Sequence, residues 1–235
     1  MTDPGVSSPA ELLVRLGAIQ AALPTADGVA HFNRMYQLVT SSVDANLGAN
    51  TFVDPDWMAQ LDAVFGNLYL DAVRASVLTP DHVPGAWAPL FERRFDAGVA
   101  PLQFAFAGMN AHINRDLAVA VVNTCKQRQT SPDAGSHHAD FERVNVLLAQ
   151  VEPTIRRMVE PTLLGDLDTA FPGVQDVVAN FNMGKARETA WTSAESLWVL
   201  DQFAPDHGAA YLSALDHLAG LVGRGLLIRT AAAPS

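Results

Sequence analysis

Two histidine–acid pairs with helical spacing are the residues of this sequence best suited to chemistry. His112 and Asp116 are four residues apart, and so are His138 and Glu142. Residues four apart share one face of an α-helix, so each pair can offer an imidazole nitrogen and a carboxylate oxygen to one ion. We therefore predict that both pairs ligate a divalent metal, with zinc expected and iron or manganese as alternatives. A hydrogen-bonded structural pair is the competing interpretation.

His31 is the third histidine to which we assign a role. It precedes Phe32, on the apolar side of a helix expected to begin near Asp27. We expect His31 to lie close to His112 and Asp116 and to complete a three-ligand metal site. A core histidine with satisfied hydrogen bonds is the alternative.

Two asparagines border the apolar stripe of the segment that contains His112. With Ile113 facing the core, Asn110 and Asn114 fall on one side of the stripe, and His112 and Asp116 fall on the other. Buried polar groups without partners cost roughly 1–3 kcal/mol each, so these side chains need partners. We predict that Asn110 and Asn114 orient the substrate or the metal ligands.

The second histidine–acid segment also offers a candidate general base. Asp140 lies across the apolar stripe from His138 and Glu142. Asp140, or Glu142 if it is not bound to metal, could take a proton from a metal-bound water. The simpler interpretation is that acids in the first turn of a helix interact favourably with its N-terminal dipole.

The elements that must position these residues are helices, because apolar residues recur with a helical period almost throughout. Ser8-Pro9 and Asp54-Pro55 are typical helix starts. We find no β alternation, internal repeat or dividing linker. The sequence predicts an all-α, single-domain multi-helix bundle over residues 1–235, with an inward-facing polar site and a disordered tail at 230–235. The expected helices span roughly 9–23, 27–47, 55–78, 87–94, 99–126, 137–153 with a kink or an end at Pro153, 154–170, 185–203 and 205–222.

Composition narrows the range of partners and locations. The chain has 235 residues, a formal charge of −10 and only two lysines, so a phosphate backbone would repel it and we expect no nucleic-acid partner. Cys125 is the only cysteine, and neither a signal peptide nor an apolar run of membrane-spanning length is visible. We expect a cytoplasmic protein without a membrane partner. The low charged fraction of 17% makes a homo-oligomer one interpretation.

Several segments together resemble an uncharacterised bacterial family of all-helical proteins. The resemblance covers about residues 31–198 and implies no known activity. It rests on Phe104 to Leu117, on His31-Phe32 with Met35-Tyr36, and on Asp140-Phe141 with Asn145.

A more distant resemblance adds an expected reaction. The order of a helical histidine, a His-x3-Asp pair and a His-x3-Glu pair is similar to the zinc-dependent phospholipases C and the related single-strand-specific nucleases. Those are all-α enzymes with a cluster of zinc ions. The resemblance implies that His31 is the early ligand, with His112/Asp116 and His138/Glu142 as the two later pairs. The chain lacks their N-terminal tryptophan and the histidine that follows the first pair, so we expect one or two metals.

The resulting prediction is a metal-dependent enzyme that acts on a small molecule. Hydrolysis of a phosphoester or related ester by a metal-activated water is what the resemblance implies. Two alternatives remain open. One is a non-hydrolytic metal- or haem-dependent enzyme of small-metabolite biosynthesis, catalysing a cyclisation or an oxidation. The other is a helical protein that binds a ligand without chemistry, and in either case His31 or His112 could be the axial ligand of a haem.

Overall fold

Helices account for all the regular structure in the part of the chain that can be described. The computed structural model describes residues 5–159 and 183–229, without the side chains of 152, 153 and 155–159. Its elements are α1 (Pro9–Ala22), α2 (Gly28–Leu47), α3 (Pro55–Leu78), the 3-10 turn η1 (Pro80–His82), α4 (Ala88–Arg93), α5 (Pro101–Ala111), the π-helical turn η2 (His112–Asp116), α6 (Leu117–Gln127), α7 (His137–Val159), α10 (Met183–Phe203) and α11 (Pro205–Leu226). The predicted all-α bundle is confirmed.

The helix starts follow local side-chain chemistry. Ser8 Oγ accepts the amide of Glu11 at 3.2 Å, and Asp54 Oδ1 accepts the amide of Trp57 at 2.9 Å. Each of these caps is followed by a proline, whose missing N–H costs nothing at the first helical position. Asp54 is therefore a helix cap, which is the simplest interpretation of its sequence context.

Two predicted boundaries differ from the structure. The third helix ends at Leu78 as predicted, but α7 continues through residue 153 to Val159. The predicted helix 99–126 is divided by a π-helical turn. The rest of the predicted helix 154–170, and the tail 230–235, lie outside the described residues.

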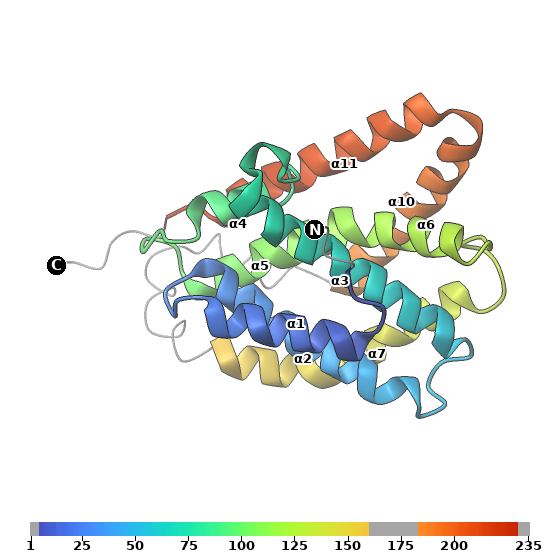
Figure 1. Cartoon of the computed structure of the whole chain (residues 1–235), viewed down its shortest axis with the longest axis horizontal. Coiled ribbons are helices and arrows are strands. Elements are labelled where there is room, and N and C mark those ends of the chain that lie inside the picture. Colours follow the sequence, from blue (N-terminus) through green and yellow to red (C-terminus); the bar gives the residue numbers. More distant parts are fainter. Residues whose placement is uncertain (1–4, 160–182, 230–235) are drawn as a thin grey trace.

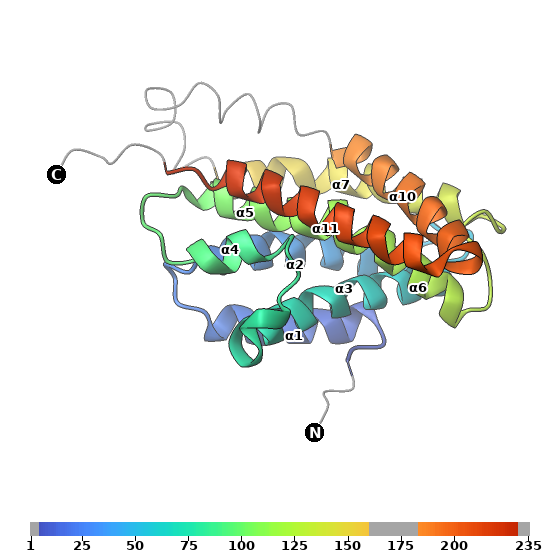
Figure 2. The ribbon, with the colours of Figure 1, turned by 90° about the horizontal axis from the view of Figure 1, so that it is seen from above.

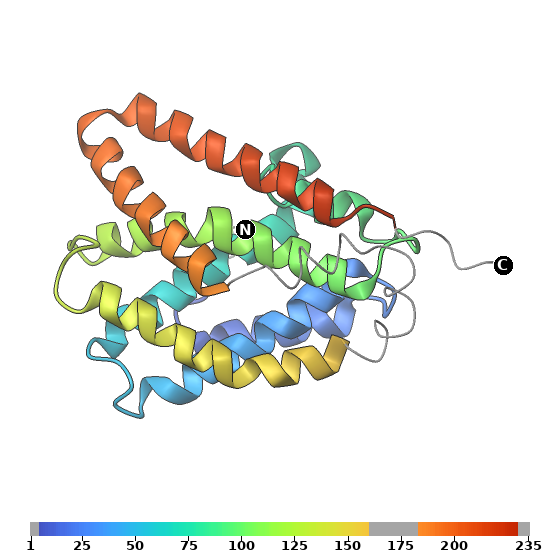
Figure 3. The same cartoon turned by 180° about the vertical axis from the view of Figure 1, so that it is seen from behind.

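The bundle has an inner segment, α5–η2–α6, with other helices around it (Figure 1). In Figure 2, α1 lies on one outer side and α7 and α10 lie on the opposite side. α2 and α11 pack on α5, α3 and α10 pack on α6, and the view from behind shows α7 running beside α2 (Figure 3). The segment that carries His112 and Asp116 is therefore enclosed on several sides.

Close contact between α2 and α5 fixes the position of His112. A Cβ atom on Gly108 would lie 2.4 Å from Cγ of Phe32, so only glycine lets the two helices approach this closely. Phe32 also meets Tyr69 and Trp87 edge-on, with ring centroids 5.1 and 5.3 Å apart. His112 follows Gly108 by one helical turn and therefore enters this aromatic core.

Candidate active site around His112

His112 begins a single π-helical turn between α5 and α6. The amide of Leu117 donates to the carbonyl of His112, which is the i→i+5 hydrogen bond of a π-helix. Such turns are rare in proteins, and many of those that exist lie at functional sites. The sequence did not predict it, because the apolar stripe continues across residues 112–116 without a break.

Aromatic rings surround the side chain of His112, which is 4% exposed. It stacks on Phe65 with centroids 3.5 Å apart, and Tyr36 meets it edge-on at 4.6 Å. Phe32 and Trp87 lie at centroid distances of 5.7 and 5.8 Å. Burial lowers the pKa of His112, and its contact with Asp116 opposes that change only in part. The imidazole is therefore neutral near pH 7.

Asp116 is fully buried and receives three donors. The indole Nε1 of Trp87 donates to Asp116 Oδ2 at 2.8 Å, and Arg115 Nη1 donates to Oδ1 at 2.6 Å. His112 Nδ1 lies 3.2 Å from Oδ2. A carboxylate that already accepts from a guanidinium has no proton to donate, so the Nδ1 atom of His112 carries the proton.

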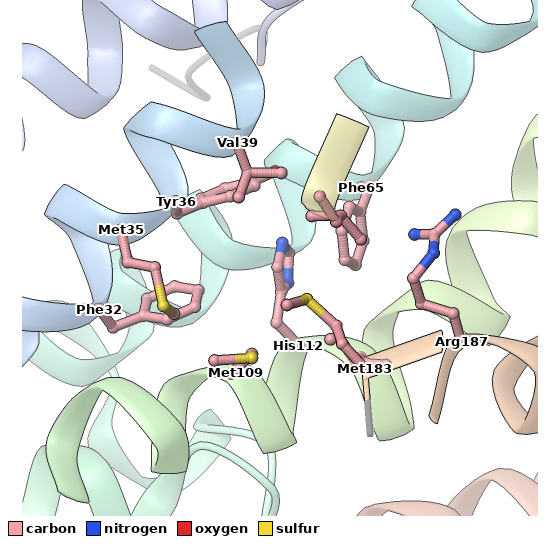
Figure 4. Close-up of a pocket in the computed structure, with 11 residues that line it drawn as sticks. Phe32, Met35, Tyr36, Val39, Phe65, Met109, His112, Met183 and Arg187 are labelled. Carbon is pink, nitrogen blue, oxygen red and sulfur yellow. The ribbon is translucent and has the colours of Figure 1, made fainter. Parts of the chain in front are cut away.

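The other ring nitrogen of His112 is left with a bare lone pair. Nε2 is buried and has no hydrogen-bond partner in the described structure. His112 lines a cavity of about 60 Å³ whose other surfaces are mainly apolar, and Figure 4 shows the imidazole among three methionines and several aromatic rings. The cavity is lined by Phe32, Met35, Tyr36, Val39, Phe65, Met109, His112, Ile113, Leu148, Met183 and Arg187.

Arg187 contributes a positive charge at the edge of this cavity, but its hydrogen bonds go to residues outside the cavity lining. Its Nε donates to Asn145 Oδ1 at 2.9 Å and its Nη2 donates to the carbonyl of Phe141 at 2.7 Å. The guanidinium also lies over the Phe141 ring, 4.1 Å from its centroid. Burial lowers the pKa of Arg187 to about 10, although the nearby Glu142 opposes the shift. Arg187 therefore joins α10 to α7.

His31 does not complete a metal site with His112 and Asp116. Its half-buried ring stacks on Phe104 at a centroid distance of 6.4 Å, and the next residue, Phe32, is the one that faces His112. Among the described residues, the three predicted ligands do not bring their ligand atoms within 4.8 Å of one another. The structure therefore does not bring the expected three ligands together, because one residue along α2 turns a side chain by about 100°.

His138 and Glu142 do lie together, and a third residue joins them. Ligand atoms of His138, Glu142 and Glu188 lie within 4.8 Å of one another, the one such group of histidine, cysteine or acidic residues in the described chain. His138 Nε2 is 3.2 Å from Glu188 Oε2, and these side chains are 46% and 51% exposed. Glu142 Oε1 is buried without a partner, and Asn145 donates to Oε2 at 3.1 Å. Glu188 had no local signal, because α7 and α10 meet only in the folded chain.

Asp140 has a structural environment that does not suit the predicted general base. Its carboxylate accepts the amides of Val53 and Asp54 at 2.8 and 2.7 Å, the Ser136 hydroxyl at 2.9 Å, and a guanidinium hydrogen bond from Arg143. Burial would raise its pKa, but these hydrogen bonds outweigh burial and lower the pKa. Asp140 thus fastens the segment before α3 to the start of α7.

Asn110 and Asn114 also differ from their predicted role. Asn110 Nδ2 donates to the carbonyl of Ala219 at 2.7 Å, and Asn114 Nδ2 donates to Asn110 Oδ1 at 2.9 Å. Neither residue lines the His112 cavity. The two asparagines attach α11 to α5, which explains why polar residues border the apolar stripe there.

The fold and the site define a class: an all-helical protein in which a carboxylate orients a buried histidine, His112, beside an apolar cavity. A family model described as a family of unknown function, DUF5995, matches residues 10–229, and the chain belongs to this family. No curated protein and no solved structure matches the chain. Within the described residues, every helix is too short or too polar to cross a membrane.

Proposed function

We propose that the protein binds a small, mostly apolar molecule in the His112 cavity and that His112 Nε2 accepts a proton or hydrogen bond from it. One observation carries this proposal. The Nδ1 atom is held by Asp116, while Nε2 is buried, unpartnered and part of a cavity surface. An unpaired buried acceptor costs roughly 1–3 kcal/mol, and a ligand O–H or N–H would remove that cost.

The same arrangement suits general-base chemistry. A carboxylate that holds the far nitrogen of an imidazole fixes its tautomer and stabilises the imidazolium that forms when the ring takes a proton. Here Asp116 occupies that position, and Trp87 and Arg115 hold Asp116. We therefore favour a non-hydrolytic reaction that begins with proton removal, such as a cyclisation of a small metabolite.

The size of the cavity limits what enters it. A volume of about 60 Å³ holds roughly four to six water-sized groups, which corresponds to a molecule or terminal fragment of about five non-hydrogen atoms. A haem is far larger than this cavity, so we do not assign His112 as its axial ligand. The ligand class is a compact apolar group that carries one proton donor.

A pair of five-membered rings tests this proposal. Pyrrole and thiophene have similar size, but only pyrrole has an N–H to donate to Nε2. We expect wild-type protein to bind pyrrole about tenfold more tightly than thiophene, a difference of roughly 1.4 kcal/mol, in titrations followed by protein NMR. His112→Phe should abolish this preference, whereas the control His31→Phe should keep it. Equal binding of both rings to wild-type protein, or no binding of either, would overturn the proposal.

A second candidate function is divalent metal binding at His138, Glu142 and Glu188. The observation that favours it is the approach of three ligand atoms to within 4.8 Å of one another. One imidazole and two carboxylates suit zinc, manganese or iron, and a fourth position would remain open for water. Among the described residues, this is the group that could support a phosphoester hydrolysis of the kind implied by the resemblance to zinc phospholipases.

Metal titration tests the second candidate. We expect zinc to bind wild-type protein with one ion per chain in equilibrium dialysis, and Glu188→Gln to weaken binding at least about tenfold, as is usual for a lost ligand contact. Glu195→Gln, on the same helix but outside the group, is the matched control. Equal zinc affinity of Glu188→Gln and wild-type protein would contradict the assignment.

The cellular setting stays a prediction. Cys125 is buried and free, which favours a reducing, cytoplasmic location. The chain's charge of −10 still argues against nucleic acid as a partner. A homo-oligomer is a further prediction, which sedimentation of the purified protein would test.

A further inference from the structure

Asp216, in the middle of α11, lies against the backbone that precedes Trp87. Its Oδ2 accepts the amide of Gly85 at 2.7 Å and its Oδ1 accepts the amide of Ala86 at 3.1 Å. A Cβ atom on Gly85 would lie 2.8 Å from Asp216 Oδ2, and one on Gly220 would lie 2.6 Å from the Gly85 carbonyl. Two glycines therefore permit this close approach of α11.

Arg115 lies between two carboxylates. Its Nη1 donates a hydrogen bond to Asp116 Oδ1 at 2.6 Å, whereas its Nε lies 3.3 Å from Asp216 Oδ1 in an ion pair without a hydrogen bond. The Arg115 side chain is 17% exposed, so water screens this arrangement only in part. If either carboxylate were removed, the Arg115 guanidinium would interact with the remaining carboxylate alone. Its position relative to that carboxylate would then change.

Trp87 supplies a second connection from Asp216 to Asp116. The backbone amide of the residue before Trp87 is held by Asp216, and the Trp87 indole donates to Asp116 Oδ2 at 2.8 Å. Arg115 and Trp87, which hold Asp116 together with His112, are thus both connected to Asp216. Arg115 is connected by an ion pair, and Trp87 is connected through the backbone amide that precedes it. Asp216 itself is not part of the cavity lining.

We infer that Asp216 is a positioning residue for His112: through Arg115 and Trp87 it holds Asp116 in the geometry that keeps the proton of His112 on Nδ1 and leaves Nε2 free. This inference deepens the proposed function and rests on it for its significance. On this inference, His112 adopts the tautomer with a free Nε2 only when α11 packs against the backbone before Trp87. α11 lies more than 100 residues after Trp87 in the chain.

Nitrogen-15 NMR of the histidine ring tests the inference without any ligand. In wild-type protein we expect a His112 spectrum of the Nδ1–H tautomer with a bare Nε2. In Asp216→Asn we expect the ratio of Nδ1–H to Nε2–H tautomer to fall about tenfold, equivalent to roughly 1.4 kcal/mol, together with a shift of the Trp87 indole proton. Asp206→Asn, an exposed position in the first turn of the same helix, is the matched control and should leave both signals unchanged.

A purely structural role for Asp216 predicts a different result. It would lower the melting temperature of Asp216→Asn and leave the His112 and Trp87 signals as in the wild type, and this outcome would overturn the inference. If Asp216→Asn does not fold, Arg115→Gln breaks one of the two connections and should change the tautomer ratio in the same direction. Failure of the proposed function would instead show in the pyrrole titration, which this experiment does not use.

Discussion

The two histidine–acid pairs have the same spacing and have opposite environments. His112 and Asp116 are 4% and 0% exposed and lie 3.2 Å apart, and Asp116 takes two further donors. His138 is 46% exposed, and its closest carboxylate belongs to Glu188, on another helix. A spacing of four residues places two groups on one helix face, but the neighbouring helices decide whether they form a closed network or an open cluster.

Because of this contrast, we expect the stability of the protein to respond differently to substitutions in the two pairs. In the buried pair, each partner offsets the desolvation of the other, so the loss of one leaves a costly group behind. In the other cluster, water can replace either of the exposed partners His138 and Glu188, and salt screens the remaining attraction. Stability should therefore depend on the first pair, whereas any role of the second pair depends on what it binds.

The largest expected effect is the loss of the Asp116 charge. Asp116→Asn keeps the shape of the side chain but weakens the charge-assisted hydrogen bond from Arg115, which keeps only Asp216 as a charged partner. We therefore expect the free energy of unfolding to fall by about 2 kcal/mol in urea denaturation. Glu188→Gln removes the charge of an acid that is 51% exposed in the other cluster, and it should cost less than about 1 kcal/mol. Similar losses in the two variants would show that burial does not distinguish the pairs.

A smaller effect is expected from the titration of His112. Burial holds the pKa of His112 below its ordinary value, so the unfolded chain takes up a proton near pH 6.5 before the folded chain does. The free energy of unfolding should thus fall as the pH decreases through about 6.5. Urea denaturation at about pH 7.5 and 5.5 should show a steeper fall for wild-type protein than for His112→Phe. Equal slopes would mean that His112 titrates as if it were exposed.

The smallest effect is expected from His138 in protein without added metal. His138→Ala removes a largely exposed ion-pair partner of Glu188, so we expect a change of less than about 0.5 kcal/mol in the free energy of unfolding. Its stacking on Trp191, with centroids 4.7 Å apart, adds only a modest contact. A loss of several kcal/mol would show that this pair is structural and would remove the contrast.

Two features of the sites were predicted correctly from helical spacing alone, and one was not. The pairing of His112 with Asp116 and the proximity of His138 to Glu142 follow from helical periodicity, and both are found in the structure. His31 does not join His112 and Asp116 as expected, because an apolar neighbour such as Phe32 does not determine which way the adjacent residue points.

The helices, the side-chain caps at Ser8 and Asp54 and the two four-residue pairs could be predicted from the sequence alone, because they depend on side chains within one or two helical turns. Tertiary structure decided which pair was buried, and it supplied partners that lie far along the chain. Trp87 is 29 residues from Asp116, Glu188 is 50 residues from His138, and Asp216 is 131 residues from Gly85. Such contacts arise when helices pack to bury their apolar faces, and no local pattern specifies which polar groups then meet.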